Sequence, residues 1–501
     1  MDHPISSPAS AAGPTARAEG RLPLLDALRG LAALGILWRN IFVFGLPTVA
    51  FTLPEEWGLS TASNVFTWLF VVIFVDGTMR GLFSMLFGAT AILIMARHER
   101  NPGGVFAADL YFRRLMWLVA FGLVHGYLLL WPFDVLYVYG LLGMFLFVFR
   151  NMSGRALLAI ALVLFAISSV KDGTGWSLEQ ASIDAFDAKQ AAMQASGETD
   201  TAETAAPEAG AEAEAGAESA ADASAQEGPS DLEEAVRIEL EDLERLALAE
   251  IDERLAPYPD LLRTIAAETF QEQTTLFFTD HVLDVGAMMF FGMAFFRLGA
   301  FSGRWPLRRS AAMAAIGLSG GVVLGFLIHG TTTLAGFENW QIGTADAYLY
   351  NARRLLLCLG LIGLFDVLLR RHAGAVLLAP LAAVGRIPLT TYVGQTVVCI
   401  VLFYGLGFGL FGTFEHHELL LIAFTINAVQ IVLAVLWART GRQGPLEALL
   451  RFLIRGGGVL PERGVVTRIP AASASPEKPS PERSRTARAA ASGKAKGGLR
   501  R

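Results

Sequence analysis

Residues 418–438 read ELLLIAFTINAVQIVLAVLWA, a run whose only charged side chain, Glu418, stands at its start. A helix needs about 20 mostly apolar residues to cross the hydrocarbon core of a bilayer, so this run predicts a transmembrane helix. Similar runs occupy 24–46, 77–96, 113–131, 134–150, 154–170, 281–300, 311–329, 350–370 and 386–410. We therefore predict an all-α polytopic bundle of about ten transmembrane helices. Residues 63–75 are apolar but too short to cross alone, and we expect them at the interface or as an outward extension of the second span.

The composition of the whole chain agrees with a membrane protein. Of its 501 residues, 53% are hydrophobic and 17% are charged, and the mean hydropathy is +0.47. Soluble domains are closer to a quarter charged. Residues 171–255 hold 23 acidic and 5 basic side chains, whereas the formal charge of the whole chain is only −6. The total therefore averages an acidic insert with a basic body and tail, and it indicates no nucleic-acid partner.

The arginines indicate how the chain is threaded through the bilayer. Alternate short loops are rich in arginine, and both tails fall on the arginine-rich side. Because cytoplasmic loops are enriched in Lys and Arg, we predict that both termini are cytoplasmic and that the acidic insert is outside. The first apolar run contains Asp26, Arg29 and Arg39, unlike the uncharged core of a cleaved signal peptide, so we interpret it as an uncleaved span.

The insert, 171–256, has two parts. Residues 195–230 are a low-complexity Ala/Glu/Gly segment that cannot bury enough apolar surface to fold. In 231–256 apolar residues recur at helical spacing among acids, which predicts an amphipathic helix that acts as a surface lid or tether. The predicted division of the chain is a disordered arm 1–20, a membrane region 21–170 with five spans, the insert, a membrane region 257–460 with five spans, and a basic disordered tail 461–501.

Polar residues on the first helix mark one part of the candidate site, because ionisable groups inside a bilayer usually face a cavity or one another. Asp26, Arg29 and Asn40 share one face at 3.6 residues per turn. Asp26 and Arg29 lie near the cytoplasmic end, and Asn40 lies about 16 Å farther out at 1.5 Å per residue. A structural ion pair at the start of a helix is the alternative interpretation of Asp26 and Arg29.

A histidine marks the other part. His125 lies in the outer half of the third span, about 18 Å beyond Arg113 by helical rise. Imidazole can give or take a proton near neutral pH, which suits a general base or a relay. Asp134 follows at the outer boundary, where it can orient the ring. A structural, hydrogen-bonded histidine is the alternative interpretation.

Other spans also bring polar groups to the outer half of the bilayer. Snorkelling to the interface explains some of them. The remainder predict a polar cavity that opens to the outside, with arginines suited to an anionic group. The residues concerned are Asp76, Arg80, His281, Asp284, His329, Arg353, Arg354, Gln395 and Tyr404.

Three further signals do not predict a cofactor or metal site. Cys358 and Cys399 lie in apolar runs and are interpreted as buried free thiols. The stretch GFGLFG at 407–412 matches a dinucleotide-binding pattern but follows a membrane span rather than a strand, so close helix packing or a helix end is the better interpretation. The stretch EHHE at 415–418 lacks metal-ligand spacing and is interpreted as a solvated loop. We predict no bound metal and no resident cofactor.

Four stretches resemble a known family. These are RLPLLDALRGLAALGILWRNI at 21–41, RGLFSMLFGA at 80–89, GLVHGYLLLWPFDVL at 122–136, and above all 385–456. They resemble the YeiB-like bacterial inner-membrane proteins, also called domain of unknown function family 418. The first-helix pattern of that family is similar to that of transmembrane acyltransferases, which move an acyl group from cytosolic acyl-CoA to an acceptor across the membrane. In the sugar O-acyltransferases a histidine stands where this chain has Asn40, so His125 is the candidate for the imidazole.

The resemblance implies transmembrane acyl transfer as the leading hypothesis. His125 would serve as general base or transient acyl carrier, oriented by Asp134, and Asn40 and Arg80 would stabilise the oxyanion. Arg29 would meet the phosphates of acyl-CoA, which is a co-substrate. The remaining predicted substrate-binding residues are Asp26, Asp76, Arg353, Gln395 and Tyr404.

Two other functions are compatible with the same sequence. One is a transporter or exporter of a small anionic metabolite or lipid, which would use the cavity without covalent chemistry. The other is a non-catalytic membrane partner that recruits a protein through its acidic insert. In all three cases the lipid bilayer is a partner, and the expected location is the bacterial inner membrane.

Overall fold

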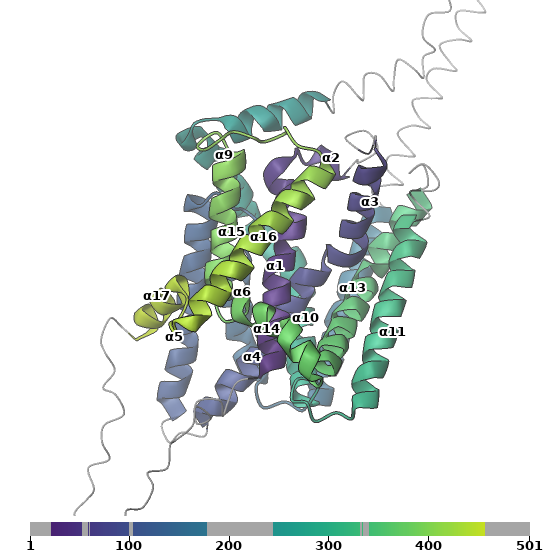
Figure 1. Ribbon diagram of the computed structural model, residues 1–501, viewed down its shortest axis with the longest axis vertical. Helices are drawn as coiled ribbons and strands as arrows, with labels where there is room; N and C mark the ends of the chain where they lie inside the picture. Colours follow the sequence, from purple (N-terminus) through teal and green to yellow (C-terminus); the bar gives the residue numbers. More distant parts are fainter. Residues whose placement is uncertain are drawn as a thin grey trace, which may run out of the picture. The chain divides into compact units, whose positions relative to one another are not determined.

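Helices account for all the regular structure in the described part of the chain, as the computed structural model shows (Figure 1). The structure describes residues 22–52, 59, 61–99, 104–177, 244–330, 333 and 340–455. The predicted arm, the low-complexity part of the insert and the basic tail lie outside these residues.

The described helices follow one another closely along the chain. Those before the insert are α1 (Pro23–Gly45), α2 (Val49–Thr52), α3 (Ala62–Phe70), α4 (Thr78–Glu99), α5 (Gly104–Leu123), α6 (Val135–Leu146), the 3₁₀ turn η4 (Phe147–Phe149) and a helix Gly154–Ser177. Those after it are a helix over 244–255, α9 (Tyr258–Gln273), α10 (Val282–Arg297), α11 (Leu307–Gly325), α13 (Trp340–Leu369), α14 (His372–Val384), α15 (Pro388–Phe403), α16 (His416–Arg439) and α17 (Pro445–Ile454).

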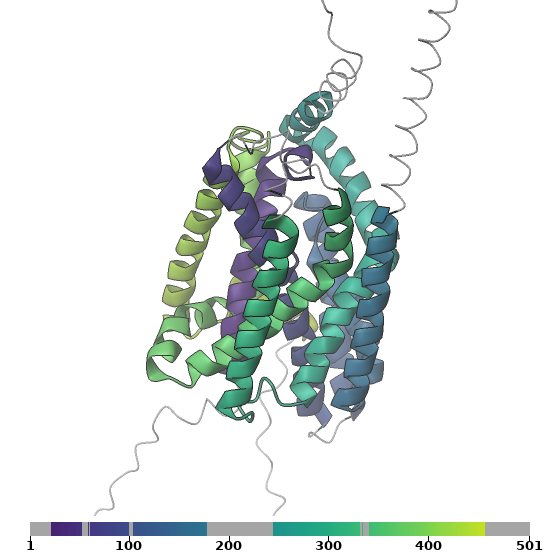
Figure 2. The ribbon, with the colours of Figure 1, turned by 90° about the vertical axis from the view of Figure 1, so that its right-hand side faces the viewer.

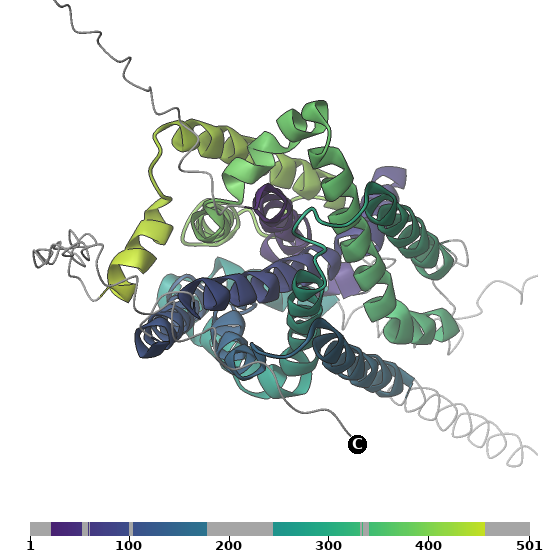
Figure 3. The same cartoon turned by 90° about the horizontal axis from the view of Figure 1, so that it is seen from below.

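The first helix lies among the others (Figure 3) and packs against α4, α14, α15 and α16. Small residues make this approach possible. A Cβ atom added to Gly30 would overlap the carbonyl of Leu381 on α14, and one added to Gly385 would overlap the carbonyl of Asp26. Close backbone contact through small residues is the usual way in which membrane helices associate. The crossing brings the start of α1 beside the loop between α14 and α15.

Two helices present apolar side chains outward from the bundle. Leu421 and Leu433 on α16 are exposed, and so are Val163 and Ile167 on the helix Gly154–Ser177. Figure 2 shows these helices on opposite flanks of the bundle. Long apolar helices that stay exposed after folding need a lipid environment, because in water such surfaces would be covered. The chain is therefore an all-α membrane protein, as its sequence predicts.

Each of the ten predicted spans coincides with a helix, but the number that crosses the bilayer stays a prediction. Among the described residues, six helices are long and apolar enough to cross, and a seventh span results if α14 and α15, bent by 67° at their junction, count as one. The segment 63–75 extends the second span, because Ala62–Met95 qualifies as one candidate. Helices α5, α6 and α13 are not among these candidates, because they are too short or carry several charged residues.

The bundle has two distinguishable ends. At one end, which we call the termini end, α1 begins and α17 lies against the start of α15, where the Leu389 N–H donates to Glu447 (2.8 Å). At the other, the insert end, the helix 244–255 lies over the loops. There the Thr48 N–H donates to Glu250 (2.8 Å), and the Gly405 N–H donates to the carbonyl of Arg254 (3.1 Å). The described part of the predicted amphipathic helix thus covers the insert end.

Four π-helical segments interrupt the described helices. They are η2 (Val71–Val75), η3 (Val124–Leu128), η5 (Phe277–His281) and η6 (Phe326–Gly330). Three of them contain a histidine, namely His125, His281 or His329, and η2 is followed directly by Asp76. A π turn shifts the side chains that follow it around the helix axis, and such turns are frequent at functional sites. The segments therefore draw attention to the polar groups beside them.

Candidate functional site

Two cavities lie in the described bundle and share part of their lining. The termini-side cavity has a volume of about 380 Å³, and the insert-side cavity has one of about 370 Å³. Ile36, Val135 and Tyr139 line both. On α1, Ile36 falls between Arg29, which lines the first cavity, and Asn40, which lines the second. The two cavities therefore meet inside the bundle at a wall formed by these three shared residues.

The termini-side cavity holds two predicted site residues that are already satisfied by the protein. The Arg29 guanidinium donates to Asp26 (3.2 Å), to the Thr90 hydroxyl (2.9 Å) and to the carbonyl of Gly385 (3.4 Å). Asp26 and Arg29 thus tie α1 to α4 and to the α14–α15 junction. Their ion pair agrees with the structural alternative, because three hydrogen bonds within the protein already hold the Arg29 guanidinium in place.

Two other arginines line the same cavity and are available. No ion pair joins Arg114 or Arg386 to a carboxylate among the described residues. Glu447, which also lines the cavity, accepts hydrogen bonds from the backbone N–H groups of Leu389 and Thr390. Farther in, the lining is apolar and includes Leu25, Phe83, Phe87, Leu93, Leu118 and Leu136. The cavity thus combines unpaired cations with an apolar interior, as an anionic amphiphile requires.

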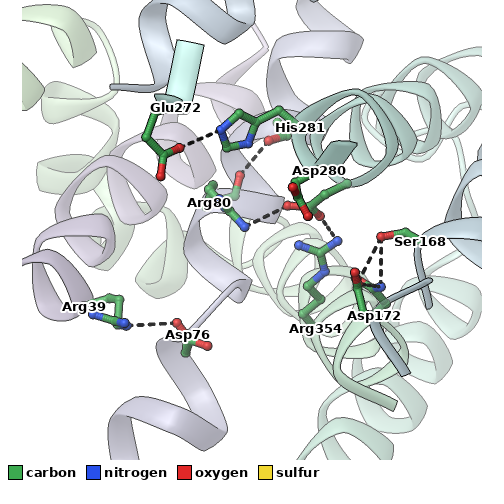
Figure 4. A network of polar contacts seen from close by, with 12 residues as sticks. Arg39, Asp76, Arg80, Ser168, Asp172, Glu272, Asp280, His281 and Arg354 are labelled. Atoms are coloured by element: carbon green, nitrogen blue, oxygen red, sulfur yellow. Dashed lines mark hydrogen bonds and ion pairs between the residues drawn. The ribbon is translucent and has the colours of Figure 1, made fainter. Parts of the chain in front are cut away.

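The arginines of the insert-side cavity are paired, in contrast. Arg39 donates to Asp76 (3.1 Å), and Arg80 donates to Asp284 (2.7 Å), which also pairs with the buried Arg354 (Figure 4). Each cation therefore has an internal carboxylate beside it. The expectation that outward-facing arginines form an anion site is not supported at this cavity, because its positive charge is already compensated.

A histidine–carboxylate pair also lines the insert-side cavity. The Nε2 atom of His281, the last residue of η5, lies 3.1 Å from Glu272 Oε2 at the end of α9. Their side chains are 17% and 16% exposed, and both residues line the cavity. The pair is therefore within reach of a molecule in that cavity.

The predicted pair His125 and Asp134 lies in a different environment. His125 Nδ1 is 2.7 Å from Asp134 Oδ1, and Nε2 is 2.9 Å from the Thr396 hydroxyl. Asp134 also caps α6 by accepting from the Tyr137 N–H (2.8 Å). The side chains of His125 and Asp134 are only 1% and 0% exposed. Both ring nitrogens are thus engaged, and His125 has no free position for a ligand in this conformation.

The His125 pair nevertheless lies between the two cavities. Asp134 borders the insert-side cavity. On the opposite side, the ring of Tyr392, which lines the termini-side cavity, packs edge-on against His125 with centroids 5.0 Å apart. His125 itself lines neither cavity. Its position is that of a residue that supports the shared wall.

The structure separates the other predicted site residues into two groups. Asn40, Asp76 and Arg80 line the insert-side cavity. The remaining three lie outside both cavities and contact other parts of the protein. Arg353 donates to the carbonyls of Val72 and Ile73 in η2, and Gln395 donates to the carbonyl of Ala33 (3.2 Å). The ring of Tyr404 lies beneath the Arg254 guanidinium, with 6.0 Å between Arg254 Cζ and the ring centroid.

Sequence reasoning missed several residues that line the cavities. Glu272 lies on α9, a polar helix in a segment to which we assigned no structure, and its pairing with His281 depends on the turn between α9 and α10. Arg114 and Arg386 belong to the arginine-rich loops that indicate orientation, and nothing else in the sequence marks them as ligand-binding residues. Tyr139 lies within an apolar run, and its hydroxyl is buried 2.8 Å from Ser84. Spacing along one chain carries no signal for such contacts.

The histidines of 415–418 form part of the packing rather than a solvated loop. Glu415 and Glu418 make a capping box at the start of α16, a standard way to satisfy the first N–H groups of a helix. His416 is buried, with Nε2 3.0 Å from the carbonyl of Ala50. The interpretation as a solvated loop is therefore wrong for His416. No cluster of potential metal ligands occurs among the described residues.

Comparisons with known proteins agree with the resemblance noted in the sequence. Residues 295–457 match the family described as protein of unknown function (DUF418). The chain is 27% identical over 445 residues to the uncharacterised protein YeiB of Escherichia coli (strain K12). This alignment covers 87% of this chain and 96% of YeiB. The chain is also 27% identical over 453 residues to the uncharacterised protein YxaH of Bacillus subtilis (strain 168), covering 86% of this chain and 93% of YxaH.

No solved structure matches the chain with significance. The two alignments nevertheless run over nearly the full length of both relatives, and the matched family region lies within α10 to α17 and its flanks. Over most of its length the chain is therefore similar to YeiB and YxaH, and residues 295–457 carry the match to the DUF418 family.

Proposed function

We propose that this protein transfers an acyl group across the bacterial inner membrane, from cytosolic acyl-CoA to an acceptor on the other side. The observation that carries the proposal is the meeting of two chemically different cavities at Ile36, Val135 and Tyr139. One cavity suits an anionic amphiphile, and the other suits a polar molecule. If the termini are cytoplasmic, as the loop charges predict, the first cavity faces the cytosol.

The donor would bind in the termini-side cavity. Arg114 and Arg386 would hold the phosphates of CoA, because an arginine that has no internal partner can bind phosphate oxygens with paired N–H groups. The acyl chain would extend along the apolar lining toward the shared wall. In this arrangement Arg29 keeps a structural role beside the phosphate site.

The acceptor would enter from the insert-side cavity. Its nucleophilic atom would attack the thioester carbonyl carbon at the shared wall, and the C–S bond would break to release CoA thiolate. Asn40 and Arg80 line this cavity and supply N–H donors for the oxyanion that forms on the carbonyl. His125 and Asp134 would hold α5, α6 and α15 in position around the reacting groups rather than touch them.

A transporter of one anionic substrate fits the cavities less well. The same substrate would have to bind in both, yet the unpaired arginines lie in one cavity and the arginines of the other are internally neutralised. Transport predicts substrate flux in vesicles without acyl-CoA. Acyl transfer predicts release of CoA that depends on the donor site.

The test uses purified full-length protein in liposomes, with acetyl-CoA and longer acyl-CoA donors and free CoA thiol as the readout. Arg114→Ala and Arg386→Ala are each expected to weaken donor binding about tenfold, the loss of one charge-assisted contact. Arg113→Ala is the matched control, because the Arg113 side chain is exposed, is paired with Asp109 and lines neither cavity. Equal donor affinity in all variants, or no CoA release by the wild type, would remove the proposal.

A further inference from the structure

The pair of His281 and Glu272 has features that the pair of His125 and Asp134 lacks. It lines the insert-side cavity, and both side chains are partly exposed there. Only one ring nitrogen, Nε2, is engaged by Glu272. Its Nδ1 atom has no hydrogen-bond partner among the described residues. A carboxylate on one nitrogen and a free position on the other is the arrangement that makes an imidazole a proton acceptor.

The surroundings of this pair define the chemistry of a ligand. On the lining of the same cavity, Arg39 is bonded to Asp76, and Arg80 is bonded to Asp284. An anionic acceptor would have to break one of these ion pairs to gain a cation. A neutral molecule with hydroxyl or amine groups can instead bond to the carboxylates and N–H groups as they stand.

We propose that His281, held by Glu272, is the general base that activates a neutral alcohol or amine acceptor in the insert-side cavity. This inference rests on the proposed function. The pair takes the role that the sequence alone assigns to His125. The residues come from the end of α9 and from η5, and Figure 4 shows them facing one another above Arg80.

The proposed reaction consumes only the acceptor and the acyl-CoA thioester. The acceptor O–H or N–H gives its proton to Nδ1 of His281, and its electron pair forms the new bond to the thioester carbonyl carbon. The tetrahedral intermediate then breaks its C–S bond, and the sulfur leaves with that electron pair. The imidazolium returns the proton to the thiolate directly or through water. Glu272 stabilises the imidazolium while it exists, as a carboxylate does in a catalytic triad.

The activity test uses full-length protein in liposomes, with acetyl-CoA as donor and glycerol or water as acceptor. His281→Ala is expected to slow CoA release about 10²- to 10⁴-fold, the usual contribution of a general base. Added imidazole is expected to restore part of the rate, because the cavity left by the ring is open to small molecules. A wild-type rate in His281→Ala, or a slow rate that imidazole does not raise, would overturn the assignment.

A second measurement does not require activity. Carbethoxylation of histidines by diethylpyrocarbonate, mapped by mass spectrometry, is expected to modify His281 and to leave His125 unmodified. Glu272→Gln is expected to slow the modification of His281 several-fold. An unreactive His281 would overturn the inference whatever the rate of CoA release. A reactive, Glu272-dependent His281 in a protein that releases no CoA would contradict the acyl donor and support the cavity-facing base.

Discussion

The two histidine–carboxylate pairs contain the same chemical groups but lie in different surroundings. His125 and Asp134 are fully enclosed, and Thr396 supplies the second hydrogen bond of the ring, whereas His281 and Glu272 both line a cavity and are partly exposed there. A buried pair stabilises the fold, because removing one partner leaves the other without water or a substitute. A pair at a cavity wall can exchange its proton with a ligand. The comparison teaches that depth in the bilayer, which sequence can indicate, does not determine access to a ligand.

The largest expected effect is a difference in the free energy of unfolding between His125→Ala and His281→Ala. His125→Ala leaves the carboxylate of Asp134 and the hydroxyl of Thr396 buried without their partner, so we expect the free energy of unfolding to fall by about 3–5 kcal/mol. His281→Ala breaks a pair that water can still reach, and we expect a loss of only about 1–2 kcal/mol. Unfolding in detergent followed by tryptophan fluorescence measures both. Equal losses would end the distinction.

A smaller effect is expected from Asp134→Asn. The amide keeps an oxygen that can accept from the Tyr137 N–H, but it replaces a charged hydrogen bond to His125 with a neutral one. Since charged hydrogen bonds contribute more than neutral ones, we expect a loss of about 1–2 kcal/mol in the free energy of unfolding. Asp260→Asn is the control, because Asp260 pairs with Arg263 on an exposed surface. A loss no larger than that of the control would show that the buried pair is unimportant.

The smallest expected effect, that of Thr396→Val, tests whether burial or the hydrogen bond protects His125 from diethylpyrocarbonate. Thr396→Val removes only the hydroxyl that faces His125 Nε2 and keeps a similar shape, so we expect a loss of about 1 kcal/mol in the free energy of unfolding. The ring should stay unreactive toward diethylpyrocarbonate, because burial and not the hydrogen bond excludes the reagent. Modification of His125 in this variant would instead mean that the Thr396 contact controls access.

Much of the fold follows from apolar run length. Each predicted span coincides with a helix, because a bilayer requires the backbone groups of a crossing segment to be satisfied internally. Helix ends depend on other forces. Helix α5 begins at Gly104 rather than near Arg113, and α9 is polar along much of its length. Hydropathy therefore found the long apolar helices but not the helix that carries Glu272.

The site was less accessible to sequence reasoning, because its contacts join residues far apart in the chain. Arg29 is on a predicted polar face, yet Thr90 and the backbone of Gly385 occupy its guanidinium. Gln395 lies at a suitable depth but bonds to α1. The cations that remain available, Arg114 and Arg386, gave no signal beyond orientation. Which polar side chain is free to bind a ligand depends on every neighbour, and one sequence does not list neighbours.

The wall made by Ile36, Val135 and Tyr139 has an electrical consequence. Water that fills a cavity from either side carries its solution's potential inward, so the voltage across the membrane falls mainly over the barrier between the two aqueous spaces. A unit charge that passes the whole barrier gains or loses about 2.3 kcal/mol per 100 mV. These three side chains would therefore form the barrier over which most of the membrane potential falls. Any charge displaced across them would sense nearly the full membrane potential.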